Sequence, residues 1–200
     1  MPFFRRKPKL PPPQWLIVGL GNPGLKYQYT RHNAGYLCMD MLSKKLGVAI
    51  SQVKFHSLVA QCEIAGQRCM LMKPTTYMNN SGRAVGECAK AYDIPAERVL
   101  VLTDDISLDV GVLRIRRKGS DGGQKGLRSI ASHLGTEEYP RIKLGVGKKP
   151  SPEARTADWV LMEMNKSELD ELKQVCEKAC EAIELIVQDE IELAMGRYSK

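Results

Sequence analysis

The sequence predicts one α/β domain, and three observations support this prediction. Short apolar runs of strand length alternate with segments whose apolar residues recur at helical spacing. The chain has 200 residues, of which 43% are hydrophobic, which is enough for one core of ordinary size. Neither an internal repeat nor a linker divides it. We therefore expect a flexible, basic, proline-rich tail at residues 1–13 and a single domain over residues 14–200.

The first half of the chain predicts three strands and two helices. They are a buried strand over 15–20, a helix over 33–46, strands over 53–64 and 69–73, and a helix that begins at Ser81. The first helix is predicted because apolar residues from Ala34 to Leu42 recur on one face, and Gly47 provides a stop. Ser81 is expected to cap the second helix, since a serine oxygen accepts hydrogen bonds from free helix N–H groups.

The second half predicts three strands and two helices. The strands are expected over 99–103, 112–116 and 142–146, and the helices from a cap at Asp121 through Leu134 and behind a cap at Ser167. Apolar and basic residues alternate over 112–116, which indicates a half-exposed strand. A polar loop over 148–157 precedes the last helix, which is strongly amphipathic.

Composition excludes several classes of protein. No run of about 18 apolar residues occurs, so a membrane-spanning helix is not expected. The six cysteines form no Cys-x-x-Cys pair, which disfavours a zinc site and is typical of reduced thiols in a cytoplasm. The net charge is +7, but four of the positive charges lie in the tail, so overall charge argues only weakly for nucleic acid. We expect a cytoplasmic protein without a metal ion or other cofactor.

One motif resembles a dinucleotide-binding fingerprint. Gly19-x-Gly21-x-x-Gly24 follows a predicted strand, with Asp40 downstream. That fingerprint requires a helix to open inside the glycine turn, where its N-terminus can hold the pyrophosphate. Here the helical spacing begins only near Asn33. An NAD-type enzyme is therefore kept as a remote alternative.

His32 is the histidine best placed for chemistry. It lies in Thr30-Arg31-His32-Asn33, at the predicted junction of a loop and a helix, where one ring nitrogen can stay exposed. A neutral imidazole can act as a general base near neutral pH, and such a base works best with an orienting carboxylate. The strand over 99–103 ends at Asp104 and Asp105, at the sheet edge where α/β proteins place their sites. The residues alone do not establish that this edge meets His32.

Five motifs occur in a fixed order after the tail. They are Asn22, His32, KPTTYMNNSG at 73–82, TDD at 103–105 and GSDGGQKGL at 119–127. Together they resemble the bacterial-type peptidyl-tRNA hydrolase family, over nearly the whole chain from Trp15 onward. The resemblance implies a single α/β domain with a mixed, twisted β-sheet surrounded by helices. It also implies metal-free hydrolysis of the ester that joins a peptide to the terminal ribose of tRNA.

The resemblance also implies roles for individual residues. By position, His32 is similar to the family's general base, Asp104 to the acid that stabilises the base, and Asn22 to the residue that favours acylated amino groups. The other positions that match substrate or tRNA contacts are Tyr27, Tyr77, Met78, Asn79, Gln124 and Lys125. The expected partner is peptidyl-tRNA, bound through its acceptor stem and 3′ end by a monomer.

Basic residues cluster in and after the predicted strand over 112–116, and such a band can neutralise phosphates. We expect electrostatic contacts to tRNA from Arg114, Arg116, Arg117, Lys118, Arg128, Arg141 and Lys143.

The chain departs from the family pattern at Gln124 and Lys125, where the usual members carry His-Asn. Glutamine forms hydrogen bonds but does not shuttle protons near neutral pH, and lysine replaces a neutral amide with a cation. We expect Gln124 to be tolerated and Lys125 to strengthen the hold on tRNA phosphate. The departure keeps a second hypothesis open, a non-catalytic RNA-binding relative of the splicing-factor type. Retention of both His32 and Asp104 favours the enzyme.

Overall fold

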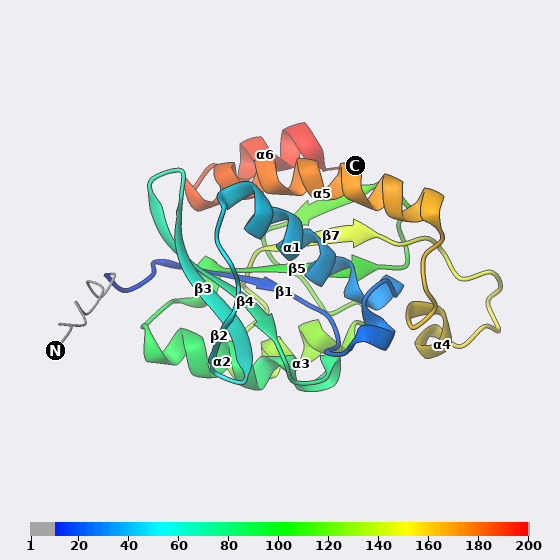
Figure 1. Ribbon diagram of the computed structural model, residues 1–200, viewed down its shortest axis with the longest axis horizontal. Helices are drawn as coiled ribbons and strands as arrows, with labels where there is room; N and C mark the ends of the chain where they lie inside the picture. Colours follow the sequence, from blue (N-terminus) through cyan, green and yellow to red (C-terminus); the bar gives the residue numbers. More distant parts are fainter. Residues whose placement is uncertain (1–10, 200) are drawn as a thin grey trace, which may run out of the picture.

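A seven-stranded mixed β-sheet runs through the centre of the molecule in this computed structural model, which describes residues 11–199 (Figure 1). The strand order is β2-β3-β4-β1-β5-β7-β6. The strands are β1 (Trp15–Gly19), β2 (Gln52–Lys54), β3 (Ser57–Ile64), β4 (Gln67–Pro74), β5 (Val99–Asp105), β6 (Leu113–Arg116) and β7 (Arg141–Gly145). β4, β1, β5 and β7 are parallel, whereas β2, β3 and β6 pair antiparallel with their neighbours. The predicted mixed α/β sheet is thereby confirmed.

Helices cover both faces of the sheet. α1 (Ala34–Leu46), α5 (Lys166–Val187) and α6 (Ile191–Tyr198) lie on one face, and α2 (Ser81–Ala91) and α3 (Lys125–Leu134) lie on the other (Figure 1). The short α4 (Thr156–Val160) lies at the end of the sheet. Within the described residues, no helix is both long and apolar enough to cross a membrane.

The two faces of the sheet form two apolar cores because side chains alternate along each strand. Ile17 of β1 packs with the α1, α5 and α6 side, and Leu16 and Val18 pack with the α2 and α3 side. All three are fully buried. β1 lies between β4 and β5, so it is hydrophobic on both faces, as central parallel strands are.

Six free cysteines belong to this interior or border it. Cys38 of α1 lies against Cys176 and Cys180 of α5, and these contacts together with burial raise the pKa of the Cys38 thiol. Burial also raises the pKa of Cys69 and of Cys88 to about 12. Five of the six side chains are buried, and Cys62 is intermediate.

The predicted strand over 53–64 is wrong, because it is two strands. β2 and β3 form a hairpin whose turn residues, Phe55 and His56, have φ values of 52° and 51°. These left-handed conformations are the ones a tight two-residue hairpin turn requires. The turn contains no glycine or asparagine, which explains why the alternating pattern concealed it.

Three predicted helix caps are also wrong. Ser81 is the first residue of α2, and its hydroxyl donates to the carbonyl of Met78 at 3.0 Å. α3 begins at Lys125 and is capped by Gln124, not by Asp121. α5 begins at Lys166 behind Asn165, which forms a capping box with Glu168, so Ser167 is not the cap. The predicted helix ends at Gly47 and Gly135 are confirmed, since both are left-handed C-caps.

The ends of the chain differ from the prediction in detail. Residues 1–10 of the predicted tail lie outside the described residues. Pro13 is buried, and the carbonyl of Pro12 accepts a hydrogen bond from Arg68 Nε at 2.9 Å. At the other end, α6 was not predicted, and α4 partly occupies the predicted loop over 148–157.

Candidate active site

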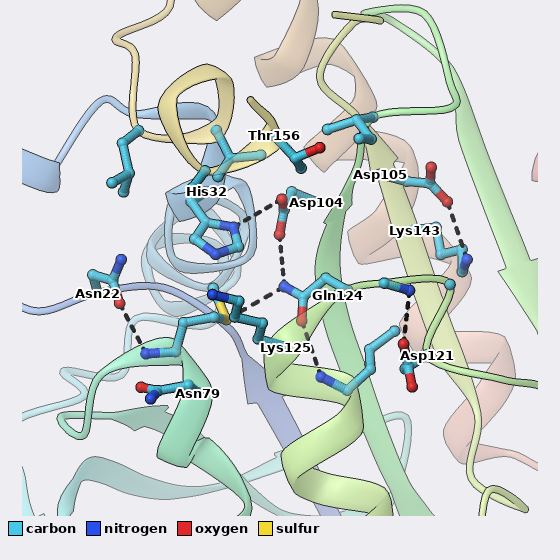
Figure 2. Close-up of a pocket in the computed structure, with 18 of the residues that line it drawn as sticks. Asn22, His32, Asn79, Asp104, Asp105, Asp121, Gln124, Lys125, Lys143 and Thr156 are labelled. Carbon is cyan, nitrogen blue, oxygen red and sulfur yellow. Dashed lines mark hydrogen bonds and ion pairs between the residues drawn. The ribbon is translucent and has the colours of Figure 1, made fainter. Parts of the chain in front are cut away.

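A cavity of 440 Å³ opens where the parallel strands β1 and β5 end. This is the edge at which open α/β sheets place ligand sites, because the loops that follow the strands diverge there. The predicted site residues that line it are Asn22, His32, Tyr77, Met78, Asn79, Asp104, Gln124, Lys125 and Lys143. Figure 2 shows this cavity. Residues far apart in the sequence are thus brought together as predicted.

His32 and Asp104 form a hydrogen-bonded pair in this cavity (Figure 2). His32 lies in the 3-10 turn Arg31–Asn33 that leads into α1, and Asp104 lies near the end of β5. Their Nδ1 and Oδ2 atoms are 2.9 Å apart, and the side chains are 12% and 3% exposed. An ionised carboxylate only accepts hydrogen bonds, so it favours the tautomer with the proton on Nδ1. The Nε2 lone pair is then available to take a proton.

Asp105 has a different partner, because successive side chains of a strand point to opposite faces. Its Oδ2 pairs with Lys143 Nζ of β7 at 3.1 Å. Burial opposes ionisation of Asp105, but hydrogen bonds from the side chain and N–H of Ser107, together with Lys143, hold the pKa of this carboxyl below its usual value. Lys143 therefore lines the cavity as a cation already paired with an acid.

The amide of Asn22 is held by contacts to two other segments. Asn33 Nδ2 donates to the backbone carbonyl of Asn22 at 3.0 Å, and Asn33 Oδ1 accepts the N–H of Asn22 at 2.9 Å. The Oδ1 of Asn22 accepts the N–H of Met78 at 2.9 Å. Asn22 Nδ2 has no acceptor within residues 11–199, so it is a donor available at the cavity. Asn33 was missed in the sequence, although its place beside His32 in the motif was the signal.

Gln124 contacts the carboxylate that pairs with His32. Its Nε2 donates to Asp104 Oδ1 at 2.8 Å, and its Oε1 accepts the N–H of Leu127 at 2.9 Å, which caps α3. Nε2 also lies 3.3 Å from the sulfur of Met78. The carboxamide thus joins the start of α3 to the carboxylate at the end of β5 (Figure 2).

The other predicted substrate contacts are placed unequally. Tyr77 is 60% exposed and lines the cavity beside Asn79. Lys125 is exposed at the start of α3, and within residues 11–199 its side chain has no ion pair or hydrogen bond. Tyr27 lies in a 3-10 turn outside the cavity lining and contacts Lys26, whose Nζ is 4.8 Å from the ring centroid.

Arg141 corrects one electrostatic prediction. It is 1% exposed, and its guanidinium donates to the carbonyls of Gly119, Ser120, Glu137 and Tyr139. A buried side chain with these partners orders the loop before α3 and cannot reach a phosphate. Arg141 is therefore removed from the predicted tRNA contacts.

Four of the remaining basic residues lie in or directly after β6, and Arg128 lies in α3. Arg114 is opposite Lys143 in the register, near the cavity, whereas Arg116 is opposite Arg141, where β7 begins. Arg117 pairs with Glu192, Lys118 with Glu138, and Arg128 with Asp121. The cations of these three pairs are exposed and the pairs contribute little to stability, so the cations can exchange partners.

A segment after α4 is attached to the 3-10 turn that carries His32. Thr30 forms an isolated β-bridge with Glu163, and the N–H of Arg31 donates to the carbonyl of Met162. The buried guanidinium of Arg31 pairs with Glu168 and donates to the carbonyl of Glu163. It also stacks on Trp159, with Cζ 3.8 Å from the ring centroid. Arg31, also missed in the sequence, thus attaches this wall of the cavity to the turn that carries His32.

The geometry does not suit a dinucleotide. Gly24 is followed by the 3-10 turn Leu25–Tyr27, and α1 begins only at Ala34, so the glycine turn presents no helix N-terminus. Gly19 and Gly21 are instead needed for packing. A Cβ on Gly19 would lie 2.6 Å from the carbonyl oxygen of Gly35, and one on Gly21 would lie 2.5 Å from the ring of Tyr36. This finding removes the NAD-type alternative.

Comparisons with known proteins agree with this arrangement. The family model described as peptidyl-tRNA hydrolase matches residues 16–200. A peptidyl-tRNA hydrolase from Lachnospira eligens is 46% identical over 185 residues, covering 92% of this chain and 99% of the relative. One from Clostridium botulinum is 45% identical over 185 residues, covering 92% of this chain and 95% of the relative.

A solved structure gives the same result. The crystal structure of peptidyl-tRNA hydrolase from Acinetobacter baumannii matches with a TM-score of 0.87 and 35% sequence identity, covering 92% of this chain and 95% of the other. The fold, the cavity and the sequence matches agree over almost the same residues. The chain therefore belongs to the peptidyl-tRNA hydrolase family.

Proposed function

We propose that the protein hydrolyses the ester bond between the peptide and the tRNA of peptidyl-tRNA, with His32 as general base and Asp104 as its orienting acid. The observation that carries this proposal is the 2.9 Å contact between His32 Nδ1 and Asp104 Oδ2 inside the cavity. His32 Nε2 takes a proton from a water molecule, which attacks the ester carbonyl. Asp104 holds the reactive tautomer and stabilises the imidazolium that forms.

Amide groups suit the second requirement, stabilisation of the oxyanion. An aminoacyl ester is reactive, so a positioned water and hydrogen-bond donors to the developing charge are sufficient, each worth about 10²- to 10⁴-fold in rate. The Nδ2 of Asn22, which has no acceptor in the part of the chain that the structure describes, and the exposed amide of Asn79 are donors that line the cavity. We assign them to the substrate carbonyls, and Met78 and Tyr77 to the walls that receive the terminal ribose or the peptide.

The RNA part of the substrate is expected at the cations next to the cavity. We assign Lys125 to a phosphate near the 3′ end, since it lines the cavity and has no acid partner within the described residues. The acceptor stem then follows the β6 edge past Arg114 toward Arg116, contacted through phosphates and not through bases. Arg117, Lys118 and Arg128 can support it by exchanging their acid partners, and Lys143 supports it from the cavity lining while paired with Asp105.

The site is built within one chain, and all six cysteines are free thiols. These features support a monomer that acts in the cytoplasm, where peptidyl-tRNA is produced and thiols stay reduced. The family match favours the hydrolase over the non-catalytic RNA-binding alternative.

The test is release of the acyl group from an N-blocked aminoacyl-tRNA. The wild type should release it, and His32→Ala should lose at least about 100-fold in kcat, the scale of a missing general base. His133→Ala is a matched control, because His133 is an imidazole outside the cavity lining. Full activity in His32→Ala would refute the assignment of the base. An inactive wild type that still binds tRNA would favour the non-catalytic alternative.

The assignment of Lys125 is tested by salt. Lys125→Asn should reduce the slope of log kcat/KM against log salt by about one, which corresponds to one phosphate contact. Lys90→Asn is a control of the same charge change on α2, outside the cavity lining. Equal slopes for Lys125→Asn and the wild type would remove Lys125 from the tRNA contacts.

A further inference from the structure

We propose that Gln124 is a positioning residue, whose carboxamide fixes the rotation of the Asp104 carboxylate and so aims its Oδ2 at His32. The proposal rests on the proposed roles of His32 and Asp104. It concerns a position at which this chain departs from the usual family pattern. Three contacts carry it: 2.9 Å from Leu127 N to Gln124 Oε1, 2.8 Å from Gln124 Nε2 to Asp104 Oδ1, and 2.9 Å between Asp104 Oδ2 and His32 Nδ1.

The amide of Gln124 has only one orientation that satisfies its neighbours. The backbone N–H of Leu127 can only donate, so the atom facing it must be the oxygen, which only accepts. The other end of the amide is then the NH₂ group. It faces Asp104 Oδ1, which as a carboxylate oxygen only accepts. The cap of α3 therefore decides which end of Gln124 meets the catalytic acid.

The carboxylate of Asp104 depends on this donor because little water reaches it. Its side chain is 3% exposed, and each of its oxygens needs a hydrogen-bond partner. His32 supplies the partner for Oδ2, and Gln124 supplies the short one for Oδ1. The hydroxyl of Thr103 lies farther from Oδ1, at 3.4 Å. Without Gln124 the carboxylate is free to rotate, and the base loses its fixed orientation.

Glutamine is suited to this task by its length and by its two different ends. Serine in its place can cap α3, because serine is a favourable N-cap, but its side chain is too short to reach Asp104. Alanine can do neither. These two substitutions therefore separate the cap from the contact with the carboxylate, and no other position needs to be changed.

Steady-state kinetics and thermal unfolding test the proposal. Gln124→Ser and Gln124→Ala should both lower kcat by about 10- to 100-fold, the scale of one hydrogen bond to a charged group, with KM unchanged. Only Gln124→Ala should also lower Tm, because it alone lacks the cap. Wild-type kcat in Gln124→Ser would overturn the proposal, as would a rise in KM in place of the fall in kcat, which would indicate a substrate contact.

Two further measurements separate this proposal from the proposed function. In an Asp104→Ala background, Gln124→Ser should have no further effect on kcat, because the residue acts through Asp104. A retained 10-fold effect would contradict the proposal. The second measurement is the NMR signal of the His32 Nδ1 proton, which requires no turnover. It should broaden in Gln124→Ser through faster exchange with water, and an unchanged signal would overturn the proposal even if the wild type proved inactive.

Discussion

Replacing Asp104 by asparagine should inactivate the protein more severely than replacing it by alanine. In Asp104→Asn, the NH₂ group of Gln124 still points at one end of the new amide, since Leu127 fixes the orientation of Gln124. The amide must therefore present its oxygen to Gln124 and its own NH₂ group to His32. His32 Nδ1 then has to accept, which moves the ring proton to Nε2, the atom that must bind the proton of water.

The expected loss follows from this tautomer. Replacing the aspartate of a serine protease triad by asparagine lowers kcat by about 10⁴-fold, because it produces the wrong histidine tautomer. We expect a loss of about 10³- to 10⁴-fold here, or roughly 4 to 5 kcal/mol in the barrier. Asp104→Ala removes the carboxylate but leaves the ring free to adopt either tautomer. Its loss should be smaller, about 10- to 100-fold, the scale of one hydrogen bond to a charged group.

The assay is single-turnover hydrolysis of an N-blocked aminoacyl-tRNA with enzyme in excess, so that product release does not limit the rate. The double variant Asp104→Asn with Gln124→Ser is the informative control. Serine at 124 no longer dictates the orientation of the amide at 104, which can then turn its oxygen to His32 and recover part of the rate. The reasoning is refuted if Asp104→Asn is as active as Asp104→Ala, or if the double variant is no faster than Asp104→Asn.

Three predictions concern stability, measured by urea unfolding. Gly82→Ala should lower the free energy of unfolding by about 2 to 3 kcal/mol, since the added Cβ would lie 2.0 Å from a backbone carbonyl oxygen of α3. Gly86→Ala is the control: its added Cβ would have its nearest neighbour at 3.2 Å, so it should change stability by less than about 1 kcal/mol. Equal effects of the two substitutions would contradict the packing argument. Asp105→Asn should destabilise the protein at pH 7, because the lowered pKa of this carboxyl makes its ionised form stabilising above the unfolded value of about 4. That difference should vanish as the pH falls through the lowered native pKa, and a constant difference would exclude the ion pair with Lys143 as its cause. Arg31→Leu should cost about 3 kcal/mol because it leaves a partly buried glutamate unpaired, and a loss below about 1 kcal/mol would show that the ion pair is not needed.

The sequence was most informative where a pattern extended over many residues. The alternation of strands and helices predicted the α/β class, and the position of Asp104 after an apolar strand placed it at the correct sheet edge. The contact between His32 and Asp104, 72 residues apart, confirms the predicted neighbourhood. Their catalytic roles remain proposals.

The sequence was least informative where several polar residues compete for one local role. Ser, Asp, Asn and Gln near a helix start can each supply a cap, and the actual caps depend on contacts such as that of Gln124 with Asp104. Arg141 shows the same limit for charge, because its guanidinium is bound by four carbonyls from the two loops that flank α3. Asn33 was overlooked because its place beside His32 indicated a site residue but not its partner, which is the backbone of Asn22.

Alkylation of the buried thiols can report when the packed helices separate from the sheet. Alkylating reagents react with thiolates, and a buried thiol whose pKa is near 12, as in Cys69 and Cys88, forms almost none at neutral pH. Labelling of Cys38, enclosed between α1 and α5, therefore requires those helices to separate. Mass spectrometry of the modified peptides can follow the two faces of the sheet separately, since Cys88 lies on the opposite side from Cys38. Substrate that fills the cavity should leave the labelling rates of Cys38 and Cys88 unchanged unless it also stabilises the whole fold.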